Sequence, residues 1–116
     1  MVRYRITEAA EADRTAILAD SRREHGDEGR RRYSLLITAA VRAVAADPER
    51  AGAHPRPELG DGLWTFHLAT ARRLVPDAVD RVRHPTHFVV YRTDGQTVWI
   101  VRILHDAMDL PRRIRD

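Results

Sequence analysis

One stretch near the C-terminus constrains the fold more than any other. Residues Val98 to Leu104 form an apolar, β-branched run that only Arg102 interrupts, which is the pattern of a strand buried on both faces. Arginine is almost never fully buried unless it is paired, so Arg102 needs a partner or a role. One interpretation is that it bonds a neighbouring acid such as Asp106 or Asp109. The other places Arg102 and His105 together on a working surface.

Three further segments have the alternating or β-branched pattern of strands. They are residues 3–6, 63–68 and 87–92, and an Asp-Gly turn joins the last of them to the strand over residues 97–104. In the first segment Tyr4 and Ile6 are expected to face inward. In the second, Trp64, Phe66 and Leu68 are expected to face the core. Because the last strand is apolar on both faces, it should lie inside the sheet, with the first strand on one side and the third on the other.

Two helices are expected between the first two strands. Thr7 is a candidate N-cap followed by acidic residues, and the first helix should end near Gly26. Its small residues would allow close helix packing: Ala9, Ala12, Ala16 and Ile17. The second helix has one apolar face and ends at Asp47-Pro48. That face consists of Tyr33, Leu36, Ile37, Ala40, Val41 and Val44. The short link over Asp27 to Gly29 predicts an antiparallel hairpin.

These elements predict one small α+β domain over residues 1–116, in the order β-αα-β-β-β. The N-terminal strand joins a curved, mainly antiparallel sheet, and the helical hairpin packs on one face of that sheet. The opposite face should stay partly open and carry Arg92, Arg102, His67 and His105. Glu49 to Gly62 is expected to be an ordered loop. Ala69 to Pro85 is expected to hold a short helix around Pro76 to Val82, and its role stays open.

Composition excludes several classes of function. The chain has no cysteine, so disulfides, thiolate metal sites and a cysteine nucleophile are excluded, and a cytoplasmic protein is expected. Its longest uncharged apolar stretch, Tyr33 to Val41, falls far short of the roughly 20 residues that span a membrane. His105, Asp106 and Asp109 lack a second histidine at metal-ligand spacing, so neither a metal nor another cofactor is expected. All 20 basic residues are arginines, and with 17 acidic residues the net charge is only +3.

Several motifs, taken in order, cover essentially the whole chain. They are Ala10, Asp13 and Ile17 in the first helix, Ala46-Asp47-Pro48, Leu59 to Phe66, His87 to Arg92, and Arg102 to Asp109. In this combination the chain resembles the RelE/ParE toxins, the toxin components of bacterial type II toxin–antitoxin modules. The ending Arg-Ile-Leu-His-x-x-Met-Asp is the specific part, and it is similar to the ParE branch.

The resemblance implies two different activities. RelE-type members cut messenger RNA on the ribosome without a metal, whereas ParE-type members bind and poison DNA gyrase and are not known as hydrolases. RNA cleavage needs an acid, a base and cations, and the residues available for these roles are Tyr91, Arg92, Arg102 and His105. The lysines and the arginine-tyrosine pair of the nuclease tail are absent, so a binding toxin that is not an enzyme is favoured. A third alternative is a non-toxic relative that binds nucleic acid.

The resemblance also implies two binding surfaces. The target would contact the end of the last strand and the tail, through Arg92, Arg102, His105, Met108, Asp109, Arg112 and Arg113. A cognate antitoxin, ParD-like or another short protein, would lay an amphipathic helix and an extended tail across the hairpin and the open sheet face. It would contact Arg30, Arg31, Tyr33, Arg72 and Arg73.

Overall fold

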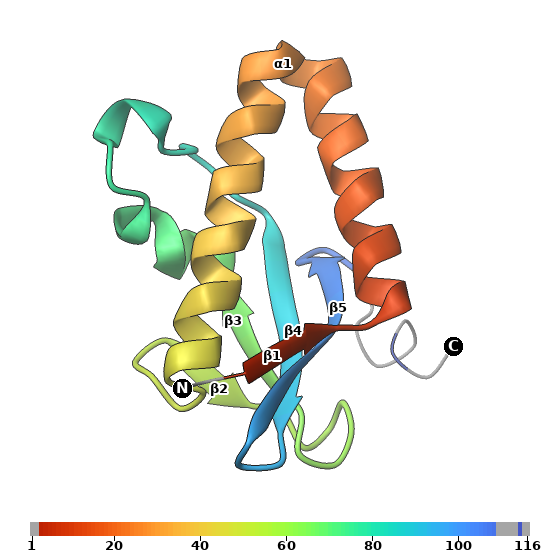
Figure 1. The fold of residues 1–116 in the computed structure, drawn as a ribbon. Coiled ribbons are helices and arrows are strands. Elements are labelled where there is room, and N and C mark those ends of the chain that lie inside the picture. The colour runs from red at the N-terminus through yellow and green to blue at the C-terminus, as the bar shows by residue number, and fades with distance from the viewer. Residues whose placement is uncertain (1–2, 109–113, 115–116) are drawn as a thin grey trace.

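The computed structural model describes residues 3–108 and 114, and it contains one five-stranded sheet (Figure 1). The strands are β1 (Arg3–Ile6), β2 (Ala53–Pro55), β3 (Trp64–His67), β4 (His87–Thr93) and β5 (Thr97–His105). Their order across the sheet is β1-β5-β4-β3-β2, with β1 parallel to β5 and every other pair antiparallel. The predicted α+β fold is therefore confirmed, including the interior place of β5 between β1 and β4. The short β2 lies inside the segment expected to be a loop.

Between β1 and β2 the chain forms α1 (Glu8–Ala46), whose two arms run antiparallel and meet at Gly26. The side chain of Thr7 caps the first arm by accepting a hydrogen bond from the Ala10 amide at 3.1 Å. Gly26 has φ 72° and ψ −171°, a conformation that is open essentially to glycine alone, so it makes the turn. The predicted link over residues 27–29 is wrong, because those residues are helical. Gly29 instead lets the arms approach, since a Cβ there would lie 2.3 Å from the His25 Cβ.

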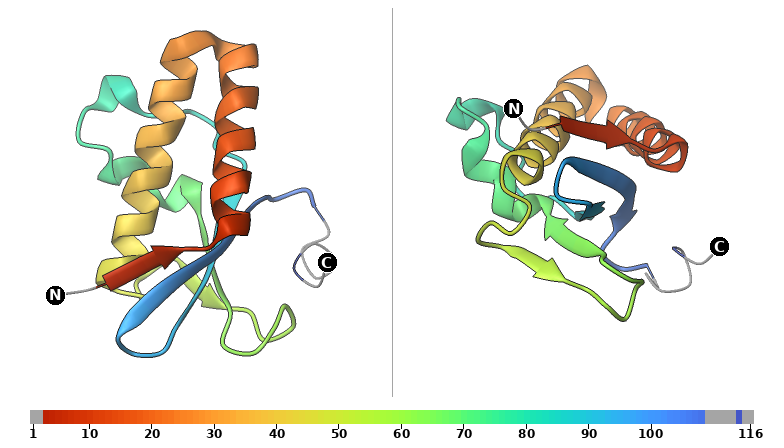
Figure 2. Two further views of the ribbon diagram at one scale, coloured as in Figure 1. Left: turned by 45° about the vertical axis from the view of Figure 1, so that its right-hand side comes forward. Right: turned by 60° about the horizontal axis from the view of Figure 1, so that its bottom comes forward.

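Both arms of α1 cover the same face of the sheet (Figure 2). All six apolar positions predicted for the second arm are buried. The prediction for the first arm is wrong in part: its buried residues are Ala10, Ile17 and Leu18, whereas Ala9, Ala12 and Ala16 are exposed. Ala10, Ile17 and Leu18 share one helix face, and the three exposed alanines lie off that face. Tyr4 is also exposed, at 42%, because β1 is an edge strand, while Ile6 packs against the core.

The opposite face of the sheet carries a second, smaller apolar cluster. It is formed by Leu59, Leu63, Val90 and Leu104, with Phe88, Val101 and Ile114 packed against it. The loop between β2 and β3 supplies Leu59 and Leu63, so part of the face expected to be open is covered. The rest of that face, toward the β4–β5 turn, has no such cover among the described residues.

The segment expected to hold a short helix forms two 3₁₀ helices, η1 (Leu68–Leu74) and η2 (Ala78–Asp80). The expected helix is confirmed in place but is only one short turn, with Asp77 as its N-cap, and η1 had no counterpart in the sequence prediction. Arginines hold the two parts of this segment together: Arg81 donates to the Val75 carbonyl and Arg72 to the Val82 carbonyl. Among the described residues, no helix combines the length and the apolar character needed to cross a bilayer.

Candidate functional site

Arg102 is held by an ion pair with the first arm of α1. Its Nε lies 2.7 Å from Asp13 Oδ2 and its Nη2 lies 2.9 Å from Asp13 Oδ1, a two-point contact. The Ile103 amide donates to the same carboxylate at 2.9 Å. The Arg102 and Asp13 side chains are only 24% and 15% exposed. Among the described residues the acid that pairs with Arg102 is therefore Asp13, and Asp106 bonds His67; Asp109 lies outside the described residues.

A bulge in β5 lies directly before Arg102. Val90 pairs with Arg102, but Tyr91 pairs with Ile100, so Val101 is an extra residue in β5. As a result Ile100 and Ile103 both join the core beneath α1, although strict alternation would put them on opposite faces. Strict alternation from Ile100 would also put Arg102 in that core, but the bulge sets it opposite Val90, and its guanidinium group meets the Asp13 carboxylate instead of being buried.

Three histidines, a tyrosine and an aspartate gather where β4 begins and β5 ends, next to α1. The Tyr33 hydroxyl accepts from the Thr86 amide and lies 2.6 Å from His87 Nδ1. This contact is a hydrogen bond between the Tyr33 hydroxyl and His87 Nδ1, and it ties β4 to the second arm of α1. Burial and the adjacent His105 lower the pKa of His87 to about 4, so this imidazole is neutral at pH 7. Burial likewise raises the pKa of Tyr33.

His105 and His67 approach the same cluster from the side of Asp106. The His105 and His87 rings meet edge to face, with centroids 5.2 Å apart. His67 Nδ1 accepts from the Ala69 amide, so Nε2 is the donor to the Asp106 carboxylate at 2.9 Å. His105 Nδ1 accepts from the Ala107 amide. Among residues 3–108 and 114, no group of three or more histidine, aspartate or glutamate side chains is arranged to hold a metal ion.

His87 and His105 lie on the wall of a groove of about 960 Å³. It runs between α1 and the chain that follows η1, and charges of both signs line it, including Glu28, Arg32 and Arg83. The groove therefore presents the neutral imidazole of His87 beside charges of both signs, and not a concentrated cluster of cations.

The four residues considered for RNA cleavage do not meet. Tyr91 is fully buried beneath α1 and donates its hydroxyl to the Pro48 carbonyl; burial raises its pKa well above the usual range. Arg92, the next residue on the strand, faces the opposite side of the sheet. His105 pairs with His87, which lies four positions along β4 from Tyr91, or about 13 Å. Together with the pairing of Arg102, this separation prevents the four from surrounding a single phosphate.

Among the other residues expected to contact the target, Arg92 and Met108 are exposed and His105 is half-buried. Asp109, Arg112 and Arg113 lie outside the described residues. Arg92 lies five positions along β4 from His87, the partner of His105, so these described residues do not form one continuous surface.

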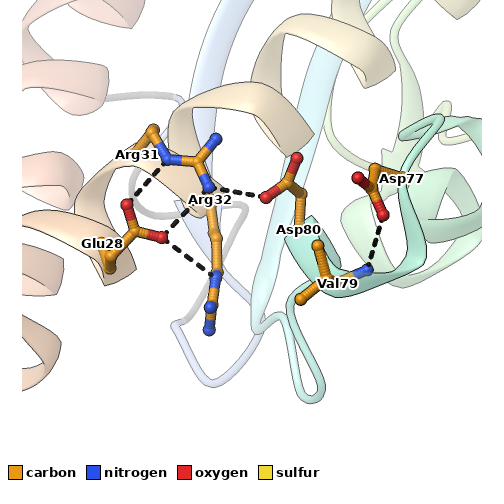
Figure 3. Close-up of polar contacts among 6 residues, drawn as sticks. All are labelled: Glu28, Arg31, Arg32, Asp77, Val79 and Asp80. Atoms are coloured by element: carbon orange, nitrogen blue, oxygen red, sulfur yellow. Dashed lines mark hydrogen bonds and ion pairs between the residues drawn. The ribbon is translucent and has the colours of Figure 1, made fainter.

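The residues expected to contact an antitoxin divide into two groups. Arg30 and Arg73 are exposed. Arg31 bonds both oxygens of Glu28 at 3.0 Å and reaches Asp80 of η2 at 2.6 Å (Figure 3). Arg72 bonds the Val82 carbonyl, and Tyr33 is only 8% exposed. Arg31, Arg72 and Tyr33 therefore have internal partners, and they fix the segment after β3 and the start of β4.

Sequence reasoning passed over two residues that organise this region. Asp13 was part of a quoted motif, but nothing near it in the sequence indicates a partner in β5. His87 appeared only as the first residue of a predicted strand, and its contact with Tyr33 spans 54 positions. Neither partnership leaves a local pattern in the chain.

Comparisons with known proteins agree with this architecture. A family model described as "ParE toxin of type II toxin-antitoxin system, parDE" matches residues 4–110. A relative named Toxin ParE, from Escherichia coli, is 31% identical over 116 residues, covering 100% of this chain and 96% of the relative. A solved structure of a chromosomal ParDE toxin–antitoxin system from P. aeruginosa superposes with a TM-score of 0.65 at 20% identity. That match covers 90% of this chain and 96% of the other.

Proposed function

Because the chain belongs to the ParE toxin family of type II toxin–antitoxin systems, we propose that it inhibits DNA gyrase by binding it, without itself catalysing a reaction. The observation that carries this proposal is the dispersal of the nuclease candidates. Tyr91 is buried beneath α1, Arg92 faces the opposite side of the sheet, and Arg102 is paired with Asp13. Metal-independent RNA cleavage requires its acid, base and cations around one phosphate. A binding toxin has no such requirement.

The proposed target surface lies at the end of β5. His105 and Met108 are the described residues that contribute to it, and Asp109, Arg112 and Arg113, which lie outside the described residues, are proposed to contribute as well. Arg92 lies five positions along β4 from His87, the partner of His105, and is not part of this surface. Arg102 has a different role in this proposal: it ties β5 to α1 and thereby fixes the strand from which His105 and Met108 project. A surface built on a rigid strand supports specific binding better than one on an unanchored tail.

The proposed second partner is a cognate antitoxin, ParD-like or another short protein, acting in the cytoplasm where gyrase works. The P. aeruginosa structure is of a system in which toxin and antitoxin belong together. Leu35 and Leu74 are 39% and 41% exposed and line one groove between α1 and η1. An amphipathic helix laid in this groove would bury them. Arg30 and Arg73 are available to meet its acidic residues.

Supercoiling and messenger RNA assays separate the two family activities. Purified toxin is expected to block supercoiling by gyrase or to trap cleaved DNA, and to leave ribosome-bound messenger RNA intact. Codon-position cuts with unaffected supercoiling would replace this proposal with a nuclease.

Tyr91→Phe is the matched control, because it removes only a hydroxyl that the proposal gives no part in the target surface. The variant should inhibit gyrase as the wild type does. Loss of toxicity in folded Tyr91→Phe protein would favour the nuclease. Unimpaired growth of a susceptible host expressing soluble, folded protein would favour a non-toxic relative.

A further inference from the structure

Three side chains form a row across the outer face of the sheet near the β4–β5 turn. Trp99 of β5 pairs directly with Arg92 of β4 and with Arg5 of β1, so the three share one face. The neighbours Val98, Ile100 and Tyr91 belong to the core beneath α1. Alternation along the strands therefore places the Arg5–Trp99–Arg92 row on the face opposite the helices. In Figure 2 that face of the sheet points away from α1.

The side chains of this row contribute little to the packing and hydrogen bonding of the fold. Arg5 and Arg92 are exposed, and within the part of the chain that the structure describes neither has a hydrogen-bond or ion-pair partner for its guanidinium group. By contrast, Arg31 and Arg102 are each paired with carboxylates. Trp99 is half-buried and belongs to neither apolar cluster. Unpaired cations around a tryptophan that does not pack in the core indicate a surface available to a ligand.

A fourth residue extends the row along the edge strand. Arg3 pairs with Thr97 two residues before Arg5, so it lies on the same face, and it too is exposed without an ion pair among the described residues. With neighbouring strands about 4.8 Å apart, the indole lies between guanidinium groups on adjoining strands. Three cations and one aromatic ring thus occupy one corner of the sheet.

Single-stranded nucleic acid matches both parts of this surface. An unpaired base stacks on an aromatic ring, and guanidinium groups bind the phosphates on either side; sheet-based nucleic-acid-binding domains use this combination. A duplex keeps its bases stacked inside, away from an indole on a sheet face. An acidic polypeptide would satisfy the arginines and leave the flat face of the indole without a matching partner.

We propose that the Arg5–Trp99–Arg92 row, with Arg3, binds single-stranded DNA. The choice of DNA over RNA rests on the proposed function, because gyrase brings the toxin to DNA. The row lies on a different part of the surface from the groove at His105, so DNA and gyrase contact the toxin at different places.

The test is the dissociation constant of a fluorescently labelled oligothymidylate, measured by anisotropy with the full chain and without gyrase. Trp99→Ala is expected to weaken binding by about 5- to 150-fold. Removing both Arg5 and Arg92 as alanine variants should reduce the slope of log affinity against log salt by about 1.4, because each phosphate contact on a single strand contributes about 0.7.

Matched variants make the test specific. Arg42→Ala removes an equal charge from an exposed position on α1, and should leave affinity almost unchanged. Fluorescence quenching by the oligonucleotide should disappear in Trp99→Phe and persist in Trp64→Phe, because Trp64 packs against the core. Trp99→Leu replaces Trp99→Ala if the latter melts early, because leucine fills the space without an aromatic ring.

Several results would refute the proposal that this row binds single-stranded DNA. They are undetectable binding, equal loss in Arg42→Ala and Arg92→Ala, tighter binding of oligouridylate, or displacement of DNA by polyglutamate as effectively as by unlabelled oligothymidylate. Gyrase inhibition is scored separately on the same preparations. Gyrase inhibition without DNA binding would refute the proposed DNA site and leave the proposed function intact. DNA binding without gyrase inhibition would refute the proposed function and leave the DNA site intact.

Discussion

Removing the Asp13 carboxylate tests the ion pair that joins α1 to β5. In Asp13→Ala the Arg102 guanidinium, 24% exposed, loses two charged hydrogen bonds, and the Ile103 amide loses its acceptor. Breaking a fully buried pair costs about 3–5 kcal/mol, and an exposed pair contributes about 0–1 kcal/mol. This pair is mostly but not fully buried, and the orphaned amide adds to the loss. We expect Asp13→Ala to lower the free energy of unfolding by about 2–4 kcal/mol.

For a chain of this length, 1 kcal/mol corresponds to about 4 °C in melting temperature, so the expected decrease is about 8–16 °C. Circular dichroism melts of Asp13→Ala, Arg102→Ala and the double variant complete a thermodynamic cycle, with an expected coupling of about 1–3 kcal/mol. Arg92→Ala is the control for a surface arginine and should change stability by less than about 0.5 kcal/mol.

Arg102→Ala distinguishes a structural role from a contact role. We expect its loss of gyrase inhibition to follow its loss of stability and to recover at temperatures where the variant is folded. If the variant instead melts with the wild type and fails to inhibit gyrase, Arg102 contacts the target and the reasoning from the ion pair is wrong.

Three further predictions concern the rest of the fold. The pKa of His87 is lowered from an ordinary 6.5 to about 4 in the folded protein, so the unfolded chain binds more protons between these two pH values. The contribution of His87 to stability is therefore complete above about pH 6.5 and is lost as the pH falls toward 4. Melting temperatures at neutral and mildly acid pH should show a smaller decrease in His87→Asn than in wild type, and equal decreases would refute the assignment. Gly26→Ala should cost about 1–3 kcal/mol by chemical denaturation from backbone conformation alone, since no atom lies within 4 Å of the added Cβ; a neutral change would contradict the turn. Ile100→Ala, fully buried, should cost about 2–5 kcal/mol in the same assay, and a loss below 1 kcal/mol would place it outside the core.

Local sequence patterns were sufficient to predict the main elements of the fold. The apolar run of β5 predicted an interior strand, and the spacing from Tyr33 to Val44 predicted the buried face of the second arm. Both depend on residues close together in the chain, where periodicity reports burial. The short β2 was missed because three residues next to a proline give no periodic pattern.

The candidate site was less predictable because its partnerships are long-range. Asp13 and Arg102 are 89 positions apart, and the bulge at Val101 beside Arg102 is visible only in the pairing with β4. Strict alternation from Ile100 would have put Arg102 on the core face beneath α1, whereas the bulge sets it opposite Val90 of the outer cluster. The paired partners of Trp99 likewise depend on the register of three strands, which no single segment reveals.

Stoichiometry tests the central claim most directly, because a binding toxin acts on its target one for one and an enzyme turns over. Supercoiling is measured while toxin is titrated at several fixed gyrase concentrations, with ribosome-bound messenger RNA followed in parallel. The toxin concentration that half-inhibits supercoiling should rise in proportion to gyrase, and the messenger RNA should remain intact at every point. Cleavage of messenger RNA by toxin present at a small fraction of the ribosomes, with supercoiling unaffected throughout, would contradict the account.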